Sequence, residues 1–152
     1  MQEALLKHLP IALKELYGGD VKESPDYARL ASSRLFDKLA NMLTQTQGRV
    51  AIGGETDLKE LYISPTIVAD VSKDDILMQD ELFGPVLPIV VVDNLDDAID
   101  YVNSKDSPLT IYPFSKNSKT IEYSTFVKFI YVIETTPCSQ AIRRILRLLV
   151  VL

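Results

Sequence analysis

Side chains that could act as a nucleophile or as metal ligands are scarce in this sequence. It contains one cysteine, Cys138, and one histidine, His8, and one residue of each kind cannot build a Cys/His zinc site. A lone cysteine is usually a small buried apolar residue. His8 stands at a polar position of a predicted helix, so we expect it at the surface. The sequence therefore predicts neither a metal site nor a catalytic residue among these side chains.

Two pairs of adjacent acidic residues are candidates for acid–base chemistry. Asp74–Asp75 and Asp96–Asp97 each stand at the start of a predicted element. Carboxylates are favoured there because they cap free backbone N–H groups and complement the helix dipole. Paired acid–base catalysis instead needs two carboxyl groups that flank a substrate. Capping and solvation are therefore the roles that we expect for both pairs.

The segment with the most specific combination of residues is 79–85, which reads QDELFGP. Gly84 permits an unusual backbone angle and Pro85 restricts the exit, so Phe83 precedes a tight turn. The acidic residues Asp80 and Glu81 come directly before it. From these letters alone, the segment could be a functional site or a solvated loop.

Composition narrows the class of protein. The chain has 152 residues, 47% of them hydrophobic and 24% charged, with a net charge of −5. This is long enough for one domain with a real core, and an acidic chain is a poor partner for nucleic acid. Lys7, Lys14 and Glu15 interrupt the apolar residues near the N-terminus. We therefore expect no signal peptide and a cytoplasmic protein.

Two amphipathic helices are predicted in the first third of the chain. Apolar residues recur at helical spacing between residues 2 and 17. Pro10 either kinks this helix or lies in its first turn, and the glycines after residue 17 end it. The second helix begins near Ser32, which is a good N-cap, and ends at Gly48.

Extended segments alternate with the helices. Strands are predicted at residues 49–52, 61–71, 86–92 and 109–114. The apolar run at 86–92 suits a strand that is buried on both faces of a parallel sheet, and Pro88 is unusual in such a strand. A short helix is predicted over 94–102. The alternation predicts an α/β fold with a largely parallel sheet and flanking helices.

Segment 79–85 resembles a motif of the NAD(P)-dependent aldehyde dehydrogenases, which carry Gln-Glu-Glu-Ile-Phe-Gly-Pro before an apolar strand. Further segments match in the family's order: Leu16–Gly19, Asp26–Arg29, Ser64–Val71, Leu95–Val102 and Ser107–Ser115. The early matches, and the Pro-Val-Leu-Pro-Ile letters of the strand, are similar to the class-three or fatty-aldehyde branch. The resemblance covers about residues 5–124. It implies that this region belongs to the family's catalytic domain.

The resemblance also implies a cofactor site. By position, Glu81 would bind the ribose hydroxyls on the nicotinamide side of NAD or NADP, and Phe83 would pack beside the nicotinamide. A carboxylate can accept two strong charge-assisted hydrogen bonds, and an apolar ring excludes water from a hydride-transfer site. The implied substrate is an aldehyde, of the fatty class in this branch, which is oxidised to a carboxylic acid.

Some family motifs do not occur in this sequence. The family's nucleophile is a cysteine in a Gly-Gln-x-Cys context, and its general-base glutamate and Gly-rich dinucleotide turn lie further upstream. None of these is present here. We therefore expect residues 1–124 to be a partial catalytic domain that is inactive by itself. Residues 125–152 depart from the family pattern, and we expect a divergent tail from a truncated or frame-shifted reading frame.

The tail and the partners allow several interpretations. Residues 142–152 intersperse Arg143, Arg144 and Arg147 with apolar residues, which allows weak association with a membrane surface. A buried terminal segment explains the same letters, and no run approaches the ~20 apolar residues of a membrane span. The resemblance allows a homo-oligomer. The alternative function is a non-catalytic pseudoenzyme or interaction module that assembles with an intact homologue.

Overall fold

The computed structural model describes residues 2–106 and 117. They fall into two compact units, one up to Val91 and one from Val92 onward. The elements of the first unit are α1 (Gln2–Tyr17), α2 (Ser33–Gln45), β1 (Arg49–Ile52), β2 (Thr56–Asp57), β3 (Tyr62–Ile63), β4 (Thr66–Ala69), the 3-10 helix η1 (Ile76–Met78) and β5 (Val86–Pro88). The second unit contains α3 (Leu95–Ser104).

The sheet of the first unit has the strand order β1-β4-β5, and β2 and β3 form a separate hairpin. β4 pairs with β5 in parallel and with β1 antiparallel. The α/β class is confirmed, but this described sheet is mixed rather than largely parallel. Antiparallel neighbours need no helical crossover, and the β2–β3 hairpin is enough to return the chain from β1 to β4. The predicted strand at 109–114 lies outside the described residues.

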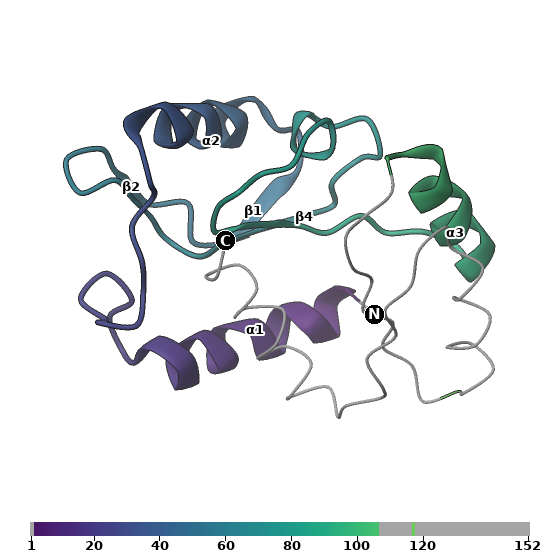
Figure 1. Ribbon diagram of the computed structural model, residues 1–152. Helices are drawn as coiled ribbons and strands as arrows, with labels where there is room; N and C mark the ends of the chain where they lie inside the picture. The colour runs from purple at the N-terminus through teal and green to yellow at the C-terminus, as the bar shows by residue number, and fades with distance from the viewer. Residues whose placement is uncertain (1, 107–116, 118–152) are drawn as a thin grey trace. The chain divides into compact units, whose positions relative to one another are not determined.

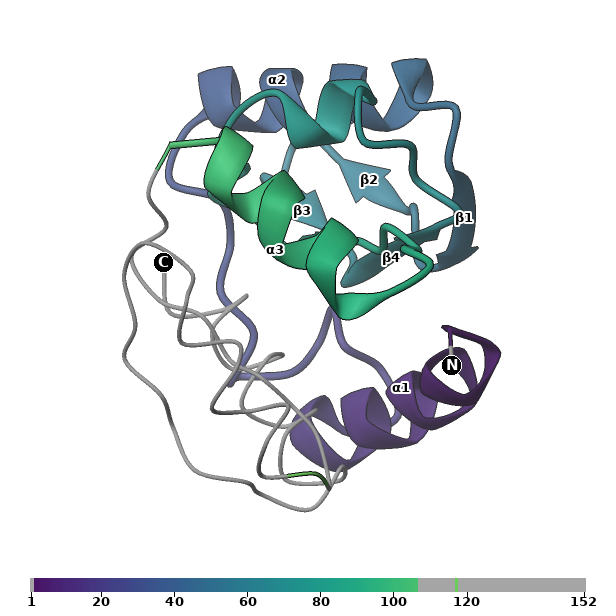
Figure 2. The same cartoon turned by 90° about the vertical axis from the view of Figure 1, so that its right-hand side faces the viewer.

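The sheet lies between two helices, with α1 on one face and α2 on the other (Figures 1 and 2). Successive side chains of a strand point to opposite faces. In β4, Ile67 packs in the cluster with Leu9 and Leu13 of α1, while Val68 packs in the cluster with Leu39 of α2. Ile67 and Val68 are both fully buried. The first unit therefore has a core on each side of its sheet.

The predicted helices are confirmed, with small changes at their ends. α1 runs through Pro10, which does not begin the helix, and stops where Gly18 takes a φ of +85°. Ser32 caps α2 by accepting a hydrogen bond from the Leu35 N–H. α2 ends at Gln45 and not at Gly48, because Thr46, whose N–H makes the last helical hydrogen bond to the Met42 carbonyl, has a ψ of 141° and leaves the helical path.

Two strand predictions need correction. The extended segment 61–71 divides into β3 and β4, on either side of Pro65. The segment 86–92 forms a strand only as far as Pro88, and Val91 is 60% exposed rather than buried. The partner strand causes this early end. Asp70 follows β4 with a φ of +58°, and among the described residues the last backbone hydrogen bond between the two segments runs from the Val71 N–H to the Ile89 carbonyl.

α3, in the second unit, confirms the helix predicted over 94–102. The Asn94 side chain caps it by accepting a hydrogen bond from the Asp97 N–H at 2.9 Å. Asp96 and Asp97 lie in its first turn, as expected for residues that complement a helix dipole. Within the described ranges, no helix is both long and apolar enough to cross a membrane.

Candidate functional site

The loop of residues 79–85 connects η1 to β5 and begins beside a buried carboxylate. Asp75 is 6% exposed. It accepts hydrogen bonds from the Leu77 N–H at 2.9 Å, from the Gln47 N–H at 2.9 Å and from the Thr46 hydroxyl at 2.9 Å. Asp75 therefore joins the C-terminal end of α2 to η1, and this contact fixes where the loop begins.

The charge of Asp75 is stabilised by these donors. Burial raises the pKa of the Asp75 carboxyl, but the backbone N–H groups of Leu77 and Gln47 and the Thr46 hydroxyl together hold it below its ordinary value. The expectation that the Asp74–Asp75 pair serves capping is confirmed for Asp75, which is the N-cap of η1. The expectation that Asp75 is solvated is wrong, because its carboxylate is buried and enclosed by its hydrogen-bond donors.

The middle of the loop is contacted by Lys38 of α2. The Lys38 Nζ lies 2.6 Å from Asp80 Oδ2 and 3.3 Å from the Glu81 carbonyl oxygen. The hydrogen bond from Lys38 lowers the pKa of the Asp80 carboxyl, so Asp80 stays charged at neutral pH. Lys38 therefore holds both sides of the Asp80–Glu81 peptide.

The end of the loop is packed against α2 and paired with β4. A Cβ atom added at Gly84 would collide with Leu39 Cδ1, and Leu39 is fully buried. The Pro85 carbonyl accepts a hydrogen bond of 2.8 Å from the Thr66 N–H. The glycine in the motif is therefore needed for a close approach between the loop and α2, and not for a positive φ.

Phe83 takes the unusual backbone conformation instead. Its φ is +48°, in the left-handed region that bulky residues rarely adopt. The residue is 49% exposed. Strained residues of this kind cluster at binding sites, where the surrounding structure holds them. The conformation presents an aromatic ring outward from an anchored loop.

A pocket of about 170 Å³ lies beside Phe83. Phe83, Gly84 and Pro85 line it together with residues 27–31, which lie in the chain between α1 and α2. The rest of the lining is apolar: Leu35, Leu61 and Ile63. Glu81 is exposed and does not line the pocket. Within the described residues, its carboxylate has no hydrogen-bond partner.

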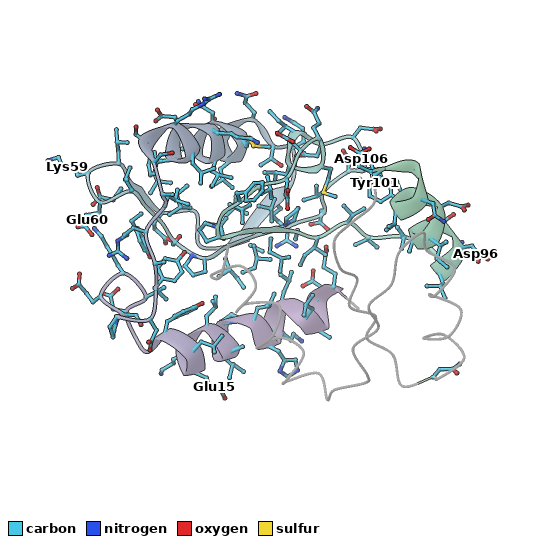
Figure 3. The ribbon with its side chains drawn as sticks, in the orientation of Figure 1. Glu15, Lys59, Glu60, Asp96, Tyr101 and Asp106 are labelled. Atoms are coloured by element: carbon cyan, nitrogen blue, oxygen red, sulfur yellow. The ribbon has the colours of Figure 1, made fainter. Side chains whose placement is uncertain are left out.

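The pocket wall formed by residues 27–31 is anchored by an aromatic cluster. The Tyr27 hydroxyl donates to the Ile63 carbonyl at 2.6 Å, and its ring meets the Tyr62 ring edge-on at 5.7 Å. Arg29 lies over Tyr62 at 5.0 Å and pairs with Glu60 at 3.3 Å. Figure 3 shows Glu60 next to Lys59, at the turn between β2 and β3.

The two residues predicted to contact the cofactor lie on one loop, but only Phe83 reaches the pocket. Sequence reasoning assigned no site role to Lys38 or Asp75, nor to Tyr27 or Arg29. The match at residues 26–29 marked Tyr27 and Arg29 as part of a family segment. No local sequence pattern indicated a role for Lys38, because its partner Asp80 is 42 residues away in the chain.

His8 and Cys138 were the remaining candidates for a nucleophile or a metal ligand. His8 is exposed on α1, as predicted. Cys138 lies outside the described residues. Over residues 2–106 and 117, no group of His, Cys, Asp and Glu side chains could hold a metal ion.

Comparison with solved structures places this fold among α/β oxidoreductases. A substrate-bound AldH of Staphylococcus aureus matches with a TM-score of 0.81 and 31% identity, over 88% of this chain and 30% of that one. An aldehyde dehydrogenase of Mycobacterium tuberculosis, complexed with NAD+, matches with a TM-score of 0.64 and 26% identity, over 74% of this chain and 25% of that one. The class is therefore that of the dehydrogenases.

The model of the aldehyde dehydrogenase family matches residues 1–126, and the chain belongs to that family. Among curated relatives, aldehyde dehydrogenase family 3 member B1 of Rattus norvegicus is 43% identical over 122 residues, which cover 80% of this chain and 26% of the relative. The chain thus spans about a quarter of the length of this relative. The resemblance to the class-three branch is confirmed.

Proposed function

We propose that this chain forms part of the nicotinamide-cofactor site of an aldehyde dehydrogenase. In this proposal Glu81 accepts hydrogen bonds from the ribose hydroxyls of NAD or NADP, and Phe83 packs beside the nicotinamide ring. The observation that carries the proposal is the anchored loop, on which a carboxylate without a partner among the described residues and a strained, exposed aromatic residue stand two residues apart. The NAD+ complex of the similar M. tuberculosis enzyme supports the choice of cofactor.

The residues present fit such a cofactor. A ribose diol has two hydroxyl donors, and a carboxylate with free lone pairs can accept both. Glu81 meets this requirement, since no described group occupies its oxygens. A planar nicotinamide ring needs an apolar surface, and about half of the Phe83 side chain is exposed for that contact. The apolar side chains that line the pocket beside Phe83 extend this apolar surface.

For the whole protein we propose the oxidation of an aldehyde, of the fatty class, to a carboxylic acid. The bound cofactor would supply the hydride acceptor of that reaction. The residues described here would act before the chemical step: Glu81 orients the ribose, and Phe83 excludes water from one side of the ring. None of them breaks a bond. The apolar lining of the pocket supports an apolar substrate.

Binding of the cofactor fragment tests this role. We expect reduced nicotinamide riboside, followed by NMR on the 152-residue chain, to shift the backbone signals of residues 79–85. Glu81→Gln should weaken binding by roughly tenfold or more, because hydrogen bonds to a charged group contribute about 1.5–3 kcal/mol. Glu23→Gln is the control, since Glu23 is exposed and remote in sequence. Equal affinities for wild type and Glu81→Gln would refute the role of Glu81.

Activity of the isolated chain is a separate question. We expect no dehydrogenase activity, because the sequence contains no Gly-Gln-x-Cys segment to provide the family's nucleophile. The measurement is NADH formation with hexanal or hexadecanal. A rate above that of a heat-denatured sample would contradict this expectation.

A second candidate function is a non-catalytic module that assembles with an intact homologue or with its own copies. Ile11 on α1 and Val91 after β5 are 56% and 60% exposed, and such apolar residues suit contacts with a partner. Co-purification with a full-length aldehyde dehydrogenase tests the first case, and the native mass of the purified chain tests the second. A monomer that captures no homologue would remove this candidate.

A further inference from the structure

The loop of residues 79–85 is anchored at its two ends, and Lys38 of α2 donates the hydrogen bonds that reach its middle. Asp75 fixes the start, and the Thr66–Pro85 hydrogen bond with the Gly84–Leu39 contact fixes the end. Among the described residues, no backbone–backbone hydrogen bond joins residues 80–83 to another element. Leu82 packs against the apolar cluster that contains Leu39, and the hydrogen bonds that reach this stretch from another element are made by Lys38.

The geometry of Lys38 suits it to hold a peptide rather than only a charge. Its Nζ donates to Asp80 Oδ2 at 2.6 Å and to the Glu81 carbonyl at 3.3 Å, so it spans the peptide between the two residues. Lys38 and Asp80 are both partly exposed, at 38% and 68% of their side chains. An ion pair this exposed contributes little to global stability. Its effect is expected to be local.

We propose that Lys38, acting with Asp80, is a positioning residue that holds Glu81 and Phe83 in the arrangement that binds the nicotinamide riboside moiety. The inference rests on the proposed function of Glu81 and Phe83. Without Lys38, residues 80–83 sample other conformations and the strained backbone at Phe83 relaxes. A ligand that needs one of these conformations then binds in proportion to its population. Neither Lys38 nor Asp80 touches the ligand in this arrangement.

A direct contact between Lys38 and the ligand is the alternative, and Asp80→Asn separates the two roles. If Asp80 only occupied a ligand-binding lysine, its neutralisation would free Lys38 and strengthen binding. If the pair positions the loop, the same substitution weakens binding. Reduced nicotinamide riboside is the appropriate probe, because it carries the ribose diol and the ring without a phosphate or a net charge. The probe therefore does not respond to a change of surface charge alone.

The experiment measures binding of this probe and amide hydrogen exchange of residues 80–83 in the full chain. We expect Lys38→Met and Asp80→Asn each to weaken binding of the probe about fivefold, because the fraction of molecules in the binding conformation falls to roughly a fifth. Both substitutions should also speed amide exchange at residues 80–83. The double variant should be no worse than Lys38→Met, because that substitution already removes both hydrogen bonds of Lys38. Lys38→Arg should restore binding, since Arg can donate to both oxygens.

The matched control is Arg34→Met, which removes a cation from an exposed position on the same helix. It should leave binding and exchange unchanged. Tighter binding by Asp80→Asn, or unchanged exchange in Lys38→Met, would overturn the positioning role. If wild type binds no probe, or Glu81→Gln binds as wild type does, the proposed function of the loop fails. Exchange of residues 80–83 then decides the role of Lys38 by itself.

Discussion

At the scale of single residues, Phe83 combines two unfavourable features. Its backbone is in the left-handed region, and the residue is about half exposed. Left-handed backbone costs a residue with a Cβ about 1–2 kcal/mol. Folding alone does not favour such a residue at this position. In the proposed function, contact between the ring and a ligand accounts for both features.

Two substitutions at Phe83 separate strain from ring contact. Phe83→Gly and Phe83→Ala both remove the ring, but only Ala keeps the Cβ atom that makes the left-handed backbone costly. We expect the Gly variant to be the more stable of the two by about 1 kcal/mol in urea unfolding. At Leu82, whose φ is not positive, the order should reverse because Gly adds entropy to the unfolded chain. A more stable Ala variant at position 83 would show that the strain is absent.

Asp75 gives a residue-scale prediction about stability. Asp75→Asn keeps the shape of the side chain but turns an amide donor toward groups that are themselves donors. Leaving such buried donors unpaired should cost about 1.5–3 kcal/mol in urea unfolding near neutral pH. Asp74→Asn is the control, because Asp74 is exposed, and it should change stability by less than about 0.5 kcal/mol.

The pH dependence of the Asp75 effect has a definite sign. The pKa of Asp75 is lower in the folded chain than in the unfolded chain. Its carboxylate therefore stabilises the fold above the unfolded pKa of about 3.9. This contribution is lost as the pH falls through the lower, folded pKa. Wild type and Asp75→Asn should differ by a constant amount between about pH 7 and pH 5 and converge below about pH 4. A difference that persists in acid would contradict this assignment.

At the scale of elements, α2 supports the loop of the site. It contributes Lys38 to the middle of the loop and Leu39 beneath Gly84, and the residues that follow it bond to Asp75. The position of the loop thus depends on one helix and on how that helix begins. The hydrogen bond from the Leu35 N–H to the Ser32 side chain is 3.3 Å long.

Removal of this cap is the element-scale prediction. Ser32→Ala should lower the free energy of unfolding by about 1 kcal/mol, because it leaves an N–H group of the first turn without its side-chain acceptor. Amide exchange should rise first at Leu35. Ser33→Ala, one residue inside α2, is the matched control and should be neutral or slightly stabilising. An equal loss in both variants would mean that the cap does not determine the effect.

At the scale of the whole described unit, the sheet separates two apolar clusters. Leu9 of α1 belongs to one and Leu39 of α2 to the other, and both are at most 1% exposed. Because the clusters share no buried member, a cavity in one should not be filled by residues of the other. The two helices should therefore contribute independently to stability.

Truncation of these leucines tests that independence. Leu9→Ala and Leu39→Ala should each cost about 2–5 kcal/mol, and their sum should match the double variant within about 0.5 kcal/mol. Ile11→Ala, at a position that is 56% exposed, is the control. If the double truncation does not fold, Leu9→Val and Leu39→Val serve for the comparison. A double variant much more stable than the sum predicts would mean that the two faces are coupled.

Much of this protein follows from local sequence. The positions of α1, α2 and α3, apart from the end of α2, follow from apolar spacing and from the caps at Ser32 and Asn94, because a helix is stabilised by contacts within a few residues. The letters of segment 79–85 and the ordered matches around it indicated the family. The structure adds reasons for two of those letters: Gly84 is needed for contact with Leu39, and Phe83 is strained.

Only the tertiary structure decided how these parts meet. The ion pair of Lys38 with Asp80 joins residues 42 apart, and the Tyr27 hydroxyl bonds to Ile63 across 36 residues. The antiparallel pairing of β1 with β4 and the early end of β5 also depend on partner strands. None of these features has a local signature, because a partner distant in the chain is chosen by topology and packing. The sequence by itself therefore determined the helices and the family, and the arrangement around Glu81 and Phe83 required the folded chain.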